Sequence, residues 1–298
     1  MPSIQELLNQ GDYIVTDGAM GTVLFASGLE HGDPPELWNI NHPDRVADVH
    51  QVYIEAGAQV LLTNTFGGSR HRLALHNVQD QVEQANHAAA VILRRVVDQC
   101  GKDVIVAGDI GPSGEVLAPY GELAFQDAKD GFAEQAAALL AGGVELIWIE
   151  TMSDLEEVRA AVEGTREISS EIPIVTTMTF DTHGRTMMGV TPEQAFETLS
   201  SFNVVALGGN CGNGPGEIIE VITKMNSLNQ ETPLVAKANA GIPELVQGKA
   251  VYRASPATMA DYAIKSYQAG ARIIGGCCGS TPEHITAISA ALAKHTQL

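Results

Sequence analysis

Eight short apolar segments recur along the chain, each rich in β-branched residues and each ending in a small or polar residue. They end at Asp17, Asn64, Asp109, Glu150, Phe180, Cys211, Asn239 and Cys278. Runs that are apolar throughout are typical of strands buried on both faces, which occur in parallel sheets. Because consecutive parallel strands need a crossover connection, a helix is expected after each run.

The stretches between these runs carry helix signals. Apolar residues recur at helical spacing over 43–57, 81–97, 124–141 and 154–168, and later stretches open with Thr191-Pro192, Ser255-Pro256 and Thr281-Pro282. A hydroxyl residue before proline is the pattern of an N-cap followed by the first helical position. Eight alternating units predict one (β/α)8 barrel, a single domain over residues 1–298. A doubly wound sheet would want a Gly-rich G-x-G-x-x-G turn after an early strand, and none is present.

Charge and composition narrow the classes of partner. The formal net charge is −19, and such an acidic surface argues against nucleic acid and anionic membranes as partners. The N-terminus has neither the basic nor the apolar region of a secretory signal, and no apolar run approaches the roughly 20 residues of a membrane span. Only four cysteines are present, so a disulfide scaffold is not favoured. These features predict a cytoplasmic protein whose thiols serve a metal or catalysis.

Three of the four cysteines lie at predicted strand ends, where barrel enzymes carry their sites. Cys211 closes the sixth run, and Cys277 and Cys278 close the eighth. Only one strand separates these two in a barrel, so the three thiolates should be close enough to share one ion. Three thiolates with an open fourth position suit a Zn²⁺ that also takes a substrate ligand. Cys100, near the end of a predicted helix, is expected to be an ordinary packed residue.

The two cysteine motifs, GGNCG and GGCCG, are rich in glycine. Neighbouring residues of a regular strand point to opposite faces, so Cys277 and Cys278 can reach one ion only from an irregular turn. The glycines remove Cβ crowding and permit positive φ at Gly208, Gly209, Gly212, Gly275, Gly276 and Gly279. The alternatives are simple core packing of the thiols and a vicinal disulfide between Cys277 and Cys278. An iron–sulfur site is less favoured because the C-x2-C spacing is missing.

Acidic side chains stand at three other predicted strand ends. Asp17, Asp109 and Glu150 are placed to bind a substrate ammonium group or to act as bases, although Asp17 and Asp109 are equally suited to cap a helix. Glu150 differs because it follows the very apolar segment LIWI. A carboxylate there is costly without a cationic partner, and a bound α-amino group would be one.

Seven segments spread over nearly the whole chain resemble the homocysteine S-methyltransferase family. They read DGAMGT, PPELWNINHPDRV, LLTNTFGGSR, AGDIGPSGE, IETMSD, GGNCG and GGCCGSTPEHI. The resemblance implies that homocysteine is the methyl acceptor, that Cys211, Cys277 and Cys278 are zinc ligands, and that Glu150 holds the homocysteine amino group. It further implies substrate-binding roles for Asp17, Gly18, Thr63, Asn64 and Asn239.

The methyl donor is less well specified by the sequence. TNTFG and DIGPSGE are most similar to the homocysteine module of cobalamin-dependent methionine synthase, but Lys237 stands where that module often has an aromatic residue, which bears on the donor side of the pocket. The chain ends after the last barrel helix, so a methyl-corrinoid is expected on a separate protein. A small onium donor such as betaine or S-methylmethionine would favour an aromatic cage, for which Trp38, Phe66 and Tyr120 are the candidates. A hypothesis of another class is a non-catalytic zinc or redox sensor that uses Cys277 and Cys278.

Overall fold

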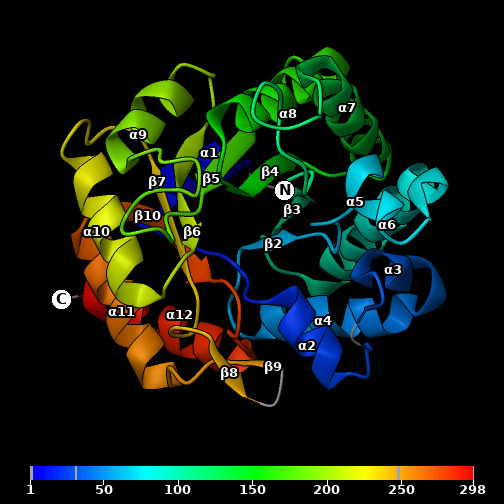
Figure 1. Ribbon diagram of the computed structural model, residues 1–298. Coiled ribbons are helices and arrows are strands. Elements are labelled where there is room, and N and C mark those ends of the chain that lie inside the picture. The colour runs from blue at the N-terminus through cyan, green and yellow to red at the C-terminus, as the bar shows by residue number, and fades with distance from the viewer. Residues whose placement is uncertain (1–2, 31, 247–248, 298) are drawn as a thin grey trace.

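The computed structural model describes residues 3–30, 32–246 and 249–297. Eight parallel strands form one sheet in the order β1 (Ile14–Val15), β10 (Ala271–Gly276), β7 (Leu234–Ala238), β6 (Ala206–Cys211), β5 (Ile174–Met178), β4 (Leu146–Met152), β3 (Ile105–Ile110) and β2 (Val60–Leu62). A parallel bridge between Thr16 and Val60 joins the two outer strands. The sheet therefore closes into the predicted (β/α)8 barrel, and its strands coincide with the eight apolar runs (Figure 1).

The main helices surround the strands (Figure 1). They are α4 (Pro43–Glu55), α6 (Val82–Cys100), α7 (Phe125–Ala141), α8 (Leu155–Ile168), α9 (Pro192–Ser200), α10 (Pro215–Asn226), α11 (Pro256–Gln268) and α12 (Pro282–Thr296). The side chains of Thr191 and Ser255 accept hydrogen bonds from the backbone N–H groups of Gln194 and Thr258, as the Thr-Pro and Ser-Pro pairs predict. In the described part of the chain, no helix is both long and apolar enough to cross a membrane.

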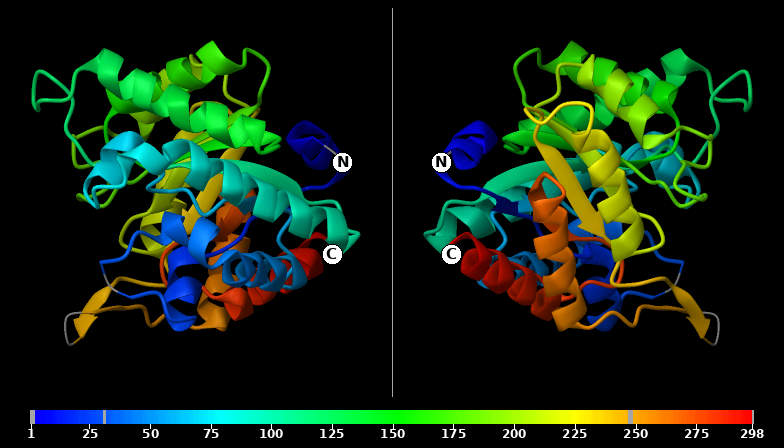
Figure 2. Two further views of the ribbon diagram at one scale, coloured as in Figure 1. Left: turned by 90° about the vertical axis from the view of Figure 1, so that its right-hand side faces the viewer. Right: turned by 90° about the vertical axis from the view of Figure 1, so that its left-hand side faces the viewer.

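Shorter elements decorate the two ends of the barrel. They are α1 (Ile4–Gln10), α2 (Met20–Ala26), η1 (Pro35–Leu37), α3 (Trp38–Asn41), α5 (Arg70–Ala74), η2 (Gln79–Gln81) and the hairpin β8 (Glu244–Val246) with β9 (Lys249–Val251). The hairpin follows β7 and projects from the carboxyl end of the barrel, whereas α1 lies at the opposite end (Figure 2). The two hairpin strands have three residues each and β8 is exposed throughout, so they lack the continuous apolar pattern that marks the barrel strands.

The core changes from apolar to polar along the barrel axis. Ile4 and Leu7 of α1 close the amino end, and they pack with inward-facing strand residues such as Ile105 and Trp148. Buried polar residues, including Glu150 and Lys237, gather nearer the carboxyl ends of the strands. This apolar layer closes the amino end of the barrel and is called the barrel floor below.

The buried His50 on α4 should make the stability of the fold depend on pH. It is fully buried, and neither ring nitrogen has a hydrogen-bond partner among the described residues. Burial lowers its pKa from 6.5 to about 3, so the unfolded chain takes up a proton before the folded chain does. Stability is therefore lost as the pH falls below the unfolded pKa, by up to about 1.4 kcal/mol per pH unit.

We expect His50→Leu to remove this loss. The free energy of unfolding in urea should fall less steeply between pH 7 and pH 5 in His50→Leu than in the parent protein. The exposed His76 offers the matched control, because His76→Leu should keep the parent slope. Equal slopes in the parent and both variants would show that His50 does not contribute to the acid sensitivity.

Candidate metal centre at the barrel mouth

Three cysteine sulfurs meet at the carboxyl end of the barrel. Cys211 ends β6, Cys277 and Cys278 follow β10, and their Sγ atoms all lie within 4.8 Å of one another. Cys211 Sγ is 2.8 Å from Cys277 Sγ and 3.8 Å from Cys278 Sγ. The expected meeting of the sixth and eighth strand ends is confirmed. Cys100, at the end of α6, instead contacts the backbone of Lys102.

The backbone at these positions leaves regular strand geometry. Cys211 itself has φ of 59°, and the following Gly212 has φ of 68°, while Gly279 has φ of 77° after the cysteine pair. A non-glycine residue in the left-handed region costs about 1–3 kcal/mol and is typically found where the surroundings fix it at a functional site. The irregular turns inferred from the sequence are therefore present.

The other motif glycines serve packing rather than positive φ. A Cβ on Gly208 would lie 2.1 Å from the Val235 carbonyl oxygen, and one on Gly275 would lie 1.9 Å from Thr16 Oγ1. Of the six motif glycines, only Gly212 and Gly279 have positive φ. These two roles cannot be told apart in the sequence, because both require the same residue type.

The donor set fits a soft divalent metal. Sulfurs bound to one tetrahedral zinc at about 2.3 Å lie about 3.8 Å apart, which is the Cys211–Cys278 separation, whereas the Cys211–Cys277 contact is shorter and would have to open. Hydrogen bonds with Cys211 and Cys277 lower the pKa of the Cys278 thiol. Asn239, directly after β7, has a buried Oδ1 without a partner in the described part of the chain. The site thus offers three thiol ligands and, in Asn239 Oδ1, a buried oxygen that can still accept a hydrogen bond.

A layer of buried charges adjoins the sulfurs. Asp17, Asp109 and Glu150 are buried near Lys237 of β7, whose Nζ lies 3.3 Å from Asp17 Oδ1 and 3.7 Å from Glu150 Oε2. The same ammonium lies 5.2 Å from the centroid of the Trp148 ring. Burial alone would lower the pKa of Lys237, but Asp17 and Glu150 raise it above its usual value, so the side chain is charged. Lys237 therefore belongs to the barrel interior, and it is the cation nearest Glu150.

The carboxylates remain incompletely paired. Burial raises the pKa of Glu150 to about 7, against the opposing effect of Lys237. Burial, and then repulsion from Glu150, raise the pKa of Asp109, and its Oδ1 has no hydrogen-bond partner among the described residues. One lysine among three buried acids leaves room for a further cation. Such a site can accept the ammonium group of a small amino acid.

Asn210, the residue before Cys211, links the acids to the sulfurs. Its Nδ2 lies 3.5 Å from Glu150 Oε2 and 3.8 Å from Cys277 Sγ, and it donates to Thr151 Oγ1 at 2.6 Å. Its Oδ1 accepts from the backbone N–H of Thr151, which has φ of 61°, and from Thr177 Oγ1. Asn210 was not among the predicted site residues, although its place inside the GGNCG motif was the available signal.

The remaining predicted substrate residues lie close to this layer. A Cβ on Gly18 would come within 2.9 Å of both Ser280 Oγ and the Tyr53 ring, so that loop approaches the cysteine turn closely. Thr63 Oγ1 accepts from the backbone N–H of Asp109 at 2.9 Å. Asn64 Nδ2 donates to the Pro35 carbonyl at 2.7 Å and to Asn39 Oδ1 at 3.1 Å. Thr63 and Asn64 thus hold neighbouring loops in place, and their contacts with a substrate stay predictions.

The aromatic residues near the mouth do not form the cage considered above. Trp38 is buried with Arg45 over its ring, Tyr120 is 83% exposed, and Phe66 packs against Gly111. An aromatic side chain that does lie beside the sulfurs is that of Tyr252, which follows β9 and packs against Gly279, the residue after Cys278; burial and the neighbouring Cys278 raise the Tyr252 pKa. No motif in the sequence marked Tyr252, because it reaches the site from an irregular connection.

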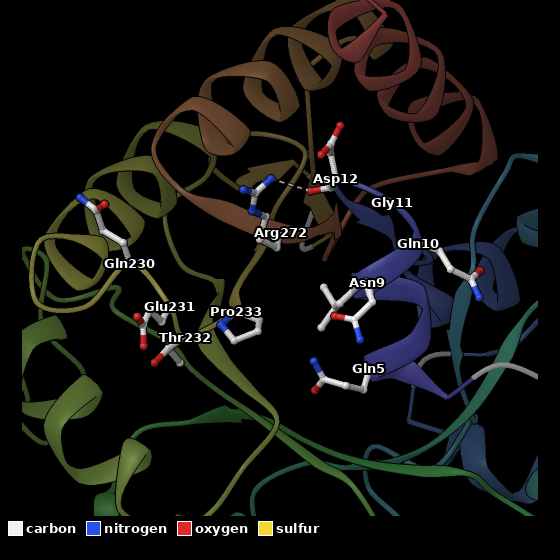
Figure 3. A pocket seen from close by; sticks show the side chains of 11 residues that line it. Gln5, Asn9, Gln10, Gly11, Asp12, Gln230, Glu231, Thr232, Pro233 and Arg272 are labelled. Atoms are coloured by element: carbon white, nitrogen blue, oxygen red, sulfur yellow. Dashed lines mark hydrogen bonds between the residues drawn. The ribbon is translucent and has the colours of Figure 1, made fainter.

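A cavity of about 460 Å³ opens at the other end of the barrel (Figure 3). Its lining includes Gln5 and Asn9 of α1, Gln230 and Thr232 before β7, and Arg272, which donates to the Asp12 carbonyl. These residues stand at the amino ends of strands, the face that serves stability in barrels of this kind. The chemistry is therefore expected at the cysteine end.

Comparison with known proteins relates nearly the whole chain to one family. Residues 14–292 match the family described as homocysteine S-methyltransferase. The methionine synthases of Mycobacterium tuberculosis and Mycobacterium leprae are 33% and 32% identical over 296 residues, which cover 94% of this chain. The chain spans about a quarter of the length of these relatives, 25% and 24%.

A solved structure supports the same relationship over the whole barrel. The metallated form of the homocysteine methyltransferase MmuM from Escherichia coli superposes with a TM-score of 0.80 at 26% identity, over 95% of this chain and 98% of that one. Its oxidised form gives a TM-score of 0.81 at 25% identity. The chain belongs to the homocysteine S-methyltransferase family.

Proposed function

We propose that this enzyme transfers a methyl group to the thiol of homocysteine to give methionine, with Zn²⁺ held by Cys211, Cys277 and Cys278. The observation that carries the proposal is that three thiols and a layer of buried acids share one end of the barrel. Bound at these thiols, the ion would let a substrate thiol ionise near neutral pH, where a free thiol is mostly protonated. The soft thiolate donors favour zinc over Mg²⁺ or Ca²⁺.

The protein's own groups then hold the substrate in one orientation. Glu150 accepts hydrogen bonds from the ammonium group, and the Asp17–Gly18 loop meets the backbone of the amino acid. Asn210 lies within hydrogen-bonding reach of both Glu150 and Cys277, which places the acid and the sulfurs close enough for one short amino acid to span them. Thr63, Asn64 and Asn239 complete the proposed pocket. Positioning of this kind supplies much of the rate acceleration when two reactants must meet in line.

We propose a methyl-corrinoid carried by a protein as the donor. Exposed apolar side chains rim the barrel mouth in the loops after β3, β5 and β7: Val116, Tyr120, Met187, Met188, Ile242 and Leu245. These side chains are the candidate contacts for such a carrier protein. The identity to methionine synthases over 94% of the chain supports the same donor class.

A small onium donor is the second candidate, and Tyr252 is the observation that favours it. One aromatic face beside Cys278 would attract a methylated cation by about 0.5–1 kcal/mol at a partly exposed position. That is weaker than a cage of several rings, so the corrinoid donor is preferred. A non-catalytic zinc or redox sensor remains the alternative of another class, and it predicts no methionine from any donor.

A donor screen tests these proposals. Reduced protein loaded with zinc is incubated with homocysteine and methylcobalamin, betaine or S-methylmethionine, and methionine is measured by mass spectrometry. We expect methionine with methylcobalamin, and none after removal of zinc by a chelator. Faster formation from betaine or S-methylmethionine would select the onium donor, and zinc-loaded protein inactive with every donor would favour the sensor.

A further inference from the structure

We infer that Lys237 is a positioning residue that sets the selectivity of this pocket for thiols carrying an α-ammonium group. It does so by occupying Asp17, so that Glu150 is left as the acceptor for the substrate. The inference rests on the proposed function, since it concerns how homocysteine is recognised. It assigns an acceptor-side role to a buried cation that the sequence linked only with the donor side of the pocket.

Asp17 has a partner inside the protein on each of its two carboxylate oxygens. Its Oδ1 receives the Lys237 ammonium at 3.3 Å, and its Oδ2 accepts the backbone N–H of Leu62 at 2.8 Å. The side chain is nearly inaccessible, and both oxygens have partners inside the protein. Lys237 therefore balances the negative charge of Asp17 inside the protein.

Glu150 is held much more loosely. Its Oε2 lies 3.7 Å from Lys237 Nζ and 3.5 Å from Asn210 Nδ2, and the described residues offer it no closer donor. Hydrogen bonds from cationic nitrogens to carboxylates are normally about 2.7–2.9 Å long, so neither contact is a full bond. A buried carboxylate with such weak partners can still accept a hydrogen bond from another donor.

Lys237 is fixed on the side of the acids that faces the barrel floor. In the sheet it pairs with Asn210, which directly precedes Cys211, and with Gly275, which lies two residues before Cys277. Its ammonium lies over the Trp148 ring. The lysine thus approaches Asp17 and Glu150 from within the barrel, while the sulfurs lie toward the mouth. A substrate can reach Glu150 from the mouth without displacing the lysine.

Removing the lysine charge should disturb this division of roles. In Lys237→Met the side chain keeps its length and its packing on Trp148, but Asp17 and Glu150 lose the cation between them. Two buried carboxylates without a counter-ion repel each other, so Glu150 is no longer held as a defined acceptor. The variant should therefore lose recognition of the ammonium group rather than of the thiol.

The experiment compares homocysteine with 4-mercaptobutyrate, which has the same thiol chain and carboxylate but no amino group. Dissociation constants are measured by calorimetry on zinc-loaded protein, and the ratio of the two constants reports ammonium selectivity. We expect the parent to prefer homocysteine and Lys237→Met to lose about tenfold or more of that ratio, the size expected when a charged hydrogen bond is lost. Zinc content should stay at the parent value, because Lys237 is not a ligand.

Two further variants keep the test decisive. Lys129→Met removes a lysine that pairs with Glu167 on the helical surface, and it should leave the ratio unchanged. Asp17→Asn combined with Lys237→Met removes both charges of the inner pair, so it should fold even if the single variant does not. Any weakening of the contact between the Asp17–Gly18 loop and the substrate should affect the binding of both thiols, so the ratio should still recover to within about threefold of the parent.

An unchanged or increased ratio in Lys237→Met, or an uncorrected loss in the double variant, would overturn the inference. Its failure is distinguishable from failure of the proposed function. If the zinc-loaded parent binds neither thiol, the proposed acceptor is wrong. If the parent binds homocysteine and makes methionine while the ratio is insensitive to Lys237, only the role of the lysine is wrong.

Discussion

Cys211→Ser is expected to lose nearly all bound zinc and nearly all methionine formation. The hydroxyl of serine is a harder and less acidic ligand than a thiol, and the two remaining sulfurs cannot complete the three-thiolate set. Loss of a residue that only orients a metal ligand typically costs about 10–100-fold in affinity or activity, so loss of the ligand itself should cost more. Elemental analysis and the methionine assay, performed on the same reduced sample, measure both effects.

Cys100→Ser is the matched control for this experiment. Cys100 lies at the end of α6, and its sulfur contacts the backbone of Lys102 rather than another thiol. The variant should keep about one zinc per chain and the parent activity. Full activity in zinc-free Cys211→Ser would refute the metal-dependent mechanism, and equal zinc loss in both variants would point to general damage by thiol removal.

The barrel and the sulfur cluster were predictable because each leaves a regular mark on the sequence. Strands buried on both faces must be apolar throughout, which makes segments such as the one ending at Glu150 visible without any structure. Cysteines that share an ion must lie at ends of strands on the same side of the barrel, and the motifs around Cys211 and Cys277 satisfied that condition. Topology then fixes their proximity.

The inner charge layer was not predictable in the same way. Lys237 stands inside an apolar strand and pairs with residues about 90 and 220 positions away in the chain. A single sequence records such long-range pairs only as isolated charges, and the cost of burying Glu150 was accordingly assigned to a substrate alone. Tyr252 escaped prediction for a related reason, since a connection after a short hairpin carries no periodicity.

Glu150→Gln should have the second largest effect, and a selective one. Glutamine keeps the shape of the side chain but has no negative charge for an ammonium group. We expect kcat/KM for homocysteine to fall by about 10–100-fold, the cost of one buried charged hydrogen bond. Zinc content should be unchanged, and binding of 4-mercaptobutyrate, which lacks the amino group, should change little.

Glu157→Gln gives a matched control, because Glu157 is also buried but accepts hydrogen bonds from Ser113 in the loop after β3. Its variant should lower stability more than kcat/KM for homocysteine. If Glu150→Gln instead keeps kcat/KM within about threefold of the parent, the ammonium group must be held elsewhere. Asp109 would then be the acceptor to examine, because its buried Oδ1 has no partner among the described residues and lies in the same charge layer. A loss specific to homocysteine would instead place the ammonium group at Glu150, between the lysine that faces the barrel floor and the sulfurs at its mouth.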